Sequence, residues 1–210
     1  LPFFFFFPKQ PDNQDAIAFA PFSVSGLQNS VLKKLPSSID EISSFKAGAQ
    51  VMGPDATKKN FLLKVEDAAV MHLATHAAVN YDNPSASYIA FYPVNDADSS
   101  YKLFAHELYN LQLPKAHLVF LSACETGSGK MSQSEGALSL SRAFAYAGCP
   151  NIITSLWKAE DKSTAYISKK PIGHYTQQLE KFLRMYNSEK KTKELIERVP
   201  FFFTNAKNPI

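Results

Sequence analysis

A cysteine and a histidine, each near the end of its own apolar segment, are the residues of this chain best suited to nucleophilic chemistry. Cys124 follows the apolar run 117–121 and precedes a turn of small residues, and His76 lies in the apolar segment 68–78. A thiol with an ordinary pKa of about 8.5 is mostly protonated at neutral pH, so it needs a base such as imidazole to become a nucleophile. The pair could therefore attack carbonyl carbons. The alternative is a cysteine that serves as a small buried hydrophobe and a histidine that is an ordinary core residue.

The sequence does not support three other kinds of functional site. The segment ending in Lys130 is similar to a phosphate-binding loop, but Cys124 occupies the first glycine position and Met131 the hydroxyl position. His72 and His76 have the spacing of a zinc-protease helix, but Leu73 replaces the general-base glutamate and the surrounding segment is strand-like. The chain also has no G-x-S-x-G elbow. We therefore expect neither a metal ion nor a cofactor.

Composition narrows the classes of function. The 210 residues are 45% hydrophobic and 20% charged, which is enough apolar material for one large globular domain. The net charge of +3 is spread along the chain, so no basic stripe favours nucleic-acid binding, and no apolar run is long enough to span a membrane. Two cysteines cannot form a disulfide framework, which favours a reducing, cytoplasmic location. The first residue is not methionine, and we expect the chain to be a piece of a longer protein.

The pattern of apolar segments predicts strands that alternate with helices, which is typical of a mainly parallel sheet covered on both faces. Ser37 or Ser38 could cap the first helix, with Glu41 completing an S-x-x-E box, while Asp55 starts the second and Pro114 ends the third. The expected strands are 16–22, 49–53, 68–78, 87–93, 117–121 and 149–157, and the expected later helices are 55–65, 101–113, 134–148, 161–170 and 175–199.

These elements suggest three regions. Residues 1–14 form an irregular segment rich in Phe and Pro, to which we assign no function. Residues 15–170 hold the alternating strands and helices of an α/β domain, and 171–210 form a charged helical tail that we expect to pack on the same domain. Cys149, between Gly148 and Pro150, is expected to begin a strand and to have no chemical role.

Several segments between Gln50 and Ile167 resemble the CHAT domain, a caspase-like cysteine-peptidase domain often associated with TPR repeats and related to separase. They are GPDATKKNFL, HLATHA, LVFLSACETGSGK, SEGALSLSRAFAYAGCPNIITSLW and AEDKSTA, in the family's order. Cys124 follows His76 by 48 residues (124 − 76), close to the spacing of about 50 in caspases. The resemblance implies a caspase-like three-layer α/β sandwich in which strands ending at Ala78 and Ala123 lie side by side. The alternative is a flavodoxin-like domain in which Cys124 has no catalytic role.

The resemblance also implies roles for individual residues. It makes His76 the catalytic histidine, Cys124 the nucleophile and His72 a structural residue. Family members usually have glycine after the catalytic histidine, where this chain has Ala77. Alanine keeps the N–H, so we expect the N–H groups of Ala77 and Cys124 to form the oxyanion hole.

The implied activity is hydrolysis of peptide bonds in protein or peptide substrates, and the alternative is an inactive caspase-like domain that only binds partners. A TPR or other sensor domain is expected to control the activity, so the isolated domain should be latent or weakly active.

An acidic pair, Glu160 and Asp161, follows the strand that ends at Trp157 and resembles the separase segment whose acidic residues line a pocket for arginine. This predicts a preference for a basic residue before the cleaved bond. Lys158, however, occupies one expected acidic position. Asp161 could equally be the N-cap of the helix that follows.

Overall fold

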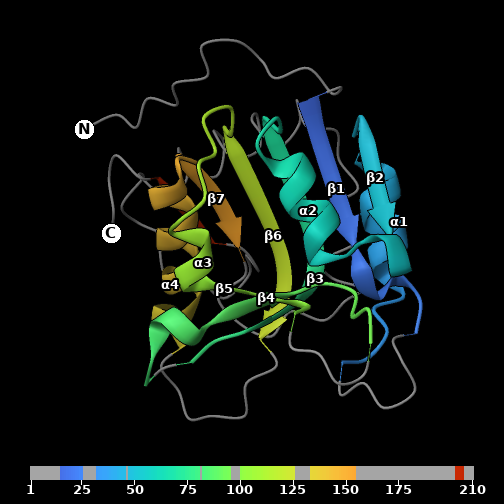
Figure 1. The fold of residues 1–210 in the computed structure, drawn as a ribbon, viewed down its shortest axis with the longest axis horizontal. Coiled ribbons are helices and arrows are strands. Elements are labelled where there is room, and N and C mark those ends of the chain that lie inside the picture. Colours follow the sequence, from blue (N-terminus) through green and yellow to red (C-terminus); the bar gives the residue numbers. More distant parts are fainter. Residues whose placement is uncertain are drawn as a thin grey trace, which may run out of the picture.

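The computed structural model describes residues 15–25, 32–45, 47–80, 82–95, 100–125, 133–154 and 202–205. Its centre is a sheet in the order β2-β1-β3-β6-β7-β8, drawn from right to left in Figure 1. Neighbouring strands are parallel from β2 to β7, and β8 is antiparallel to β7. The strands are β1 (Ala16–Ala20), β2 (Ala49–Met52), β3 (Val70–Ala78), β6 (Leu118–Glu125), β7 (Asn151–Thr154) and β8 (Phe202–Asn205).

The central strands bury side chains on both of their faces, which explains their nearly continuous apolar sequences. One face packs against α2 (Lys58–Val65) and α4 (Gln133–Ala147), together with the short α3 (Ala105–Leu108). The opposite face packs against Ile42 of α1 (Ser37–Ser44) and against Phe45, which directly follows this helix. The fold is therefore a three-layer α/β sandwich with a mainly parallel sheet, as the sequence predicts.

A small antiparallel hairpin lies at the carboxyl ends of the central strands (Figure 1). It consists of β4 (Tyr88–Ala90), which pairs with the end of β3, and β5 (Lys102–Phe104), which pairs with β4. The expected helix 101–113 is wrong in its first part, since only 105–108 are helical. Leu103 is 1% exposed and pairs with Ile89 in the hairpin, so its apolar character reflects strand burial rather than a helical face.

Two expected helix caps are also wrong. The N-cap position of α1 is Pro36 and has no side-chain cap, so neither Ser37 nor Ser38 caps this helix. The hydroxyl of Ser38 donates to the Leu35 carbonyl (2.6 Å), and Glu41 is buried against His72 instead of completing the box. At α2 the cap is Thr57, whose Oγ1 accepts from the N–H of Asn60 (3.2 Å). Asp55 lies in the preceding 3-10 turn, Gly53–Asp55.

The later elements agree in part with the expectations. Helix α4 ends where Gly148 adopts a positive φ of 113°, a conformation that L side chains rarely adopt. Phe202–Asn205 form a strand at the edge of the sheet, which corrects the expected helical character of the tail at these positions. The expected helices 161–170 and 175–199 and the segment 1–14 lie outside the described residues. Within the described part of the chain, no helix combines the length and apolar character needed to cross a membrane.

Candidate active site

The two residues expected to carry the chemistry occupy matching positions on neighbouring parallel strands. The Cα atoms of His76 in β3 and Cys124 in β6 are register partners, which confirms that the two strands lie side by side. Adjacent strands are about 4.8 Å apart, and directly paired positions share a face of the sheet. The fold therefore brings these backbone positions together at the carboxyl edge, where ligands of open α/β sheets bind.

His76 is held in one orientation by groups on the α1 side of the sheet. Its side chain is 5% exposed, and its Nε2 lies 2.7 Å from the carbonyl oxygen of Lys33. The ring of Phe22 packs edge-on against the imidazole, with 4.7 Å between ring centroids. A carbonyl oxygen can only accept, so Nε2 carries a proton and Nδ1 is the nitrogen that can take up another.

The segment that presents the Lys33 carbonyl is itself fixed. The N–H of Leu35 donates to the Phe22 carbonyl (2.8 Å), and both the N–H and the hydroxyl of Ser38 bond to the Leu35 carbonyl. Sequence reasoning missed Lys33 and Phe22. The contribution of Lys33 is a main-chain oxygen, which leaves no mark on residue type, and Phe22 is one of many phenylalanines in the chain.

His72 lies four residues earlier on β3, and its environment differs from that of His76. It is fully buried, its Nε2 is 2.6 Å from Oε1 of Glu41, and the rings of Phe45 and Phe120 pack edge-on against it. Each histidine thus has its own oxygen partner on the α1 side. Among the described residues, no three histidine, cysteine or acidic side chains lie close enough together to hold a metal ion.

Ala77 follows His76 inside β3 and is 6% exposed. Its φ is not positive, so its Cβ causes no strain at a position where the family usually has glycine. The hairpin bonds place the N–H and C=O of Ile89 on the β5 side, so Ala77, which is opposite Ile89, points its own N–H away from β4 and toward β6. The N–H of Ala77 is therefore directed at the strand that carries Cys124.

Cys149 is fully buried in the core. It is 0% exposed, with its Sγ 3.4 Å from the Asn151 carbonyl oxygen. Burial raises the pKa of its thiol to about 12, because a thiolate would lose its hydration there. The expected strand start is wrong by two residues, because β7 begins at Asn151. That Cys149 has no chemical role stays a prediction. Glu160, Asp161 and Lys158 lie outside the described residues, so the acidic pocket stays a prediction.

The layered sheet and the paired positions of His76 and Cys124 define an α/β sandwich of the caspase-like type. The family model of the CHAT domain matches residues 7–181, and the chain belongs to the CHAT domain family. A comparison with curated proteins finds no match. Family membership favours the caspase-like over the flavodoxin-like interpretation, and it relates the chain to caspase-like peptidases.

Proposed function

We propose that this chain is a cysteine endopeptidase of the caspase and separase type, which hydrolyses peptide bonds in protein substrates through Cys124 and His76. The observation that carries the proposal is the register of the two residues, together with the Lys33 carbonyl that orients the imidazole. A nucleophile, a base and a third group that orients the base form the arrangement typical of covalent acyl transfer.

The reaction takes place in two stages. His76 accepts the thiol proton of Cys124 at Nδ1, and the thiolate attacks the scissile carbonyl carbon to form a tetrahedral intermediate. The imidazolium then protonates the leaving amine as the C–N bond breaks, which leaves a thioester on Cys124. Water attacks the thioester, His76 takes a proton from that water, and the released thiolate is reprotonated as the carboxylic acid product departs.

The developing oxyanion needs hydrogen-bond donors, and we assign this role to the N–H groups of Ala77 and Cys124. The β3–β6 register continues to Ala77 and Glu125, one position beyond the catalytic pair. The Ala77 N–H can therefore serve the substrate only if strand pairing opens at that last position. This requirement is consistent with a domain that is latent until a TPR or other sensor domain acts on it. Robust turnover by residues 1–210 alone would contradict the latency.

Covalent labelling by a cysteine-directed acyl-mimic electrophile tests the proposal. We expect labelling of the wild-type chain to be lost in Cys124→Ala, strongly reduced in His76→Ala and unchanged in Cys149→Ala. Cys149 is the matched control because its buried thiol has a pKa of about 12 and stays protonated. Equal labelling of all variants would reject the peptidase and favour an inactive domain that only binds partners.

A preference for Arg or Lys before the cleaved bond is part of the same proposal. A partly buried carboxylate binds a guanidinium through charge-assisted hydrogen bonds, and Asp161 and Glu160 are the residues we assign to this role. Asp161→Asn should reduce cleavage after basic residues and leave the labelling of Cys124 intact. Cleavage after aspartate, or an unchanged preference in the variant, would reject the pocket.

A further inference from the structure

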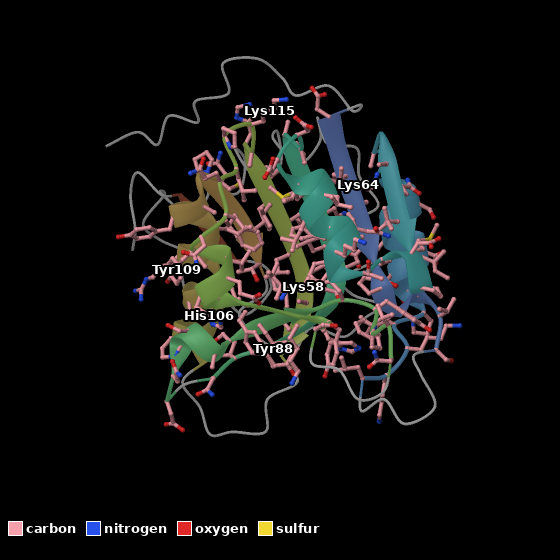
Figure 2. The ribbon with its side chains drawn as sticks, in the orientation of Figure 1. Lys58, Lys64, Tyr88, His106, Tyr109 and Lys115 are labelled. Carbon is pink, nitrogen blue, oxygen red and sulfur yellow. The ribbon has the colours of Figure 1, made fainter. Side chains whose placement is uncertain are left out.

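An ion pair outside the proposed catalytic residues joins α2 to α3. Nζ of Lys58 lies 2.6 and 2.8 Å from the two carboxylate oxygens of Glu107, and their side chains are 17% and 34% exposed. In Figure 2, Lys58 lies between α2 and the β4–β5 hairpin. Both charged groups also bond to main-chain atoms of β5, so the pair has a role beyond a surface salt bridge.

β5 is the outer strand of the hairpin, since among the described strands it pairs only with β4. Two hydrogen bonds join the two sides of the hairpin just beyond the ends of its strands: Phe91 N to Tyr101 O (2.8 Å) and Ala105 N to Ser87 O (2.7 Å). Inward and outward groups alternate along an antiparallel strand, so the N–H and C=O groups of Lys102 and Phe104 point outward. An edge of this kind can pair with another chain unless something covers it.

The Lys58–Glu107 pair covers this edge. It offers a donor to the outward carbonyl group of β5 and an acceptor to the outward N–H group. The ammonium of Lys58 donates to the carbonyl oxygen of Lys102 (2.9 Å), and the N–H of Phe104 donates to Oε2 of Glu107 (2.9 Å). A neighbouring strand would offer the same two functions, one donor and one acceptor. The ion pair thus replaces a strand along β5 and ties the hairpin to two helices.

The hairpin is attached to β3 on both sides of the segment that holds His76 and Ala77. On one side the hydroxyl of Thr75 donates to the Ala90 carbonyl (2.5 Å), and on the other Ala78 pairs with Tyr88. The position of β4 therefore determines the path of the intervening residues. Because β4 is held by β5, the outer edge of β5 is mechanically connected to the site.

We propose that Lys58 and Glu107 are positioning residues for the peptidase reaction, which hold the hairpin and, through β4, the backbone of His76 and Ala77. The inference rests on the proposed function for its effect on the reaction. Its mechanical part, the connection between the ion pair and residues 77–78, depends only on the contacts above.

Lys58→Met and Glu107→Met test the inference, since methionine keeps most of the length of each side chain and removes its charge. We expect backbone amide exchange of β4, β5 and residues 77–78 to rise by about tenfold, the factor that corresponds to one charge-assisted hydrogen bond. The rate of Cys124 labelling should fall in both variants. Asp67→Asn is the matched control, because it breaks the exposed Lys115–Asp67 pair at the far end of the molecule from the hairpin (Figure 2).

The double variant Lys58→Glu with Glu107→Lys swaps the two charges. It separates hydrogen bonding to β5 from electrostatic attraction between the two side chains. It restores the opposite charges, but a carboxylate cannot donate to the Lys102 carbonyl and an ammonium cannot accept from the Phe104 N–H. In this double variant, amide hydrogen exchange of the hairpin should therefore stay fast and Cys124 labelling should stay slow. Recovery of both wild-type rates would overturn the inference. Normal labelling in Lys58→Met and Glu107→Met despite fast exchange would also overturn it. If wild-type Cys124 is not labelled at all, the proposed function fails, and the exchange of residues 77–78 still decides the mechanical part.

Discussion

The imidazole of His76 donates from Nε2 to the carbonyl oxygen of Lys33, 43 positions earlier in the chain, across a distance of 2.7 Å. Because Nε2 donates to this carbonyl, Nδ1 is the ring nitrogen that can accept a proton in the proposed reaction. Phe22, whose own carbonyl accepts from Leu35, packs on the same ring and links the orientation of His76 to the start of α1. The functional arrangement therefore depends on residues of three separate segments.

Phe22→Leu should loosen the imidazole without removing it. Leucine lacks the ring edge that contacts His76, so we expect the rate of Cys124 labelling to fall between about fivefold and a hundredfold. The free energy of unfolding should decrease by about 1–2 kcal/mol. Labelling kinetics and urea denaturation measure the two effects.

Phe61→Leu is the control for Phe22→Leu, because Phe61 is equally buried but packs on the opposite face of the sheet, against Phe19 and Phe91. It should cost a similar free energy of unfolding and leave labelling unchanged. Equal labelling rates in the two variants would show that Phe22 only fills space.

Glu41→Gln should destabilise the fold more than most single changes. Oε1 of Glu41 bonds Nε2 of His72 at 2.6 Å with both side chains buried, and the change puts an NH₂ group in place of one carboxyl oxygen in this buried site. Leaving a buried polar group without its hydrogen-bond partner costs about 1–3 kcal/mol. Urea denaturation of the variant measures the loss.

The double variant Glu41→Leu with His72→Leu should recover much of the stability that Glu41→Gln loses, because replacing both partners by apolar side chains leaves no buried polar group without a hydrogen-bond partner. Phe45 and Phe120 already provide apolar surroundings for such side chains. A double variant less stable than Glu41→Gln would contradict this account of the pair.

Alkaline pH should destabilise the chain through Cys149. Its thiol keeps its proton up to a pKa of about 12 in the folded state, whereas in the unfolded state it ionises above about pH 8.5. Between these values the folded state binds more protons, so stability falls as pH rises, by up to about 1.4 kcal/mol per pH unit. Cys149→Ala should remove this part of the slope in urea denaturation between pH 8 and 11. An identical slope in the variant would contradict the burial of the thiol.

The sequence predicted the parts of the site that depend on strand pattern. Apolar runs ending near His76 and Cys124 indicated strands of a mainly parallel sheet. The resemblance to the CHAT domain implied that these two strands are neighbours, and the structure confirms that adjacency. The sequence did not predict the β4–β5 hairpin. The apolar residues of the short segment 101–104 have spacings that fit either a helix or a strand, and pairing with β4 decides for the strand. Glu41 likewise matched a capping box, but its side chain is buried and hydrogen-bonded to His72 instead.

The acid titration of Glu107 provides a last test of the hairpin's attachment. Burial alone would raise the pKa of this carboxyl, but the hydrogen bonds from Lys58 and the Phe104 N–H and the charges of Lys58 and His106 outweigh it, and the pKa lies below its ordinary value of 4.5. The ionised Glu107 carboxyl therefore contributes its full stabilisation of the folded state above the ordinary pKa. This contribution is lost as pH falls through the lower pKa of the folded state.

The amide proton of Phe104 reports this titration in NMR, because it donates directly to the carboxylate. We expect its chemical shift to change with a midpoint below 4.5 in the wild-type chain. Lys58→Met removes the strongest opposing group, so burial should then dominate and the midpoint should move upward. A midpoint that does not move in Lys58→Met would mean that Lys58 does not hold the Glu107 carboxylate at the edge of β5.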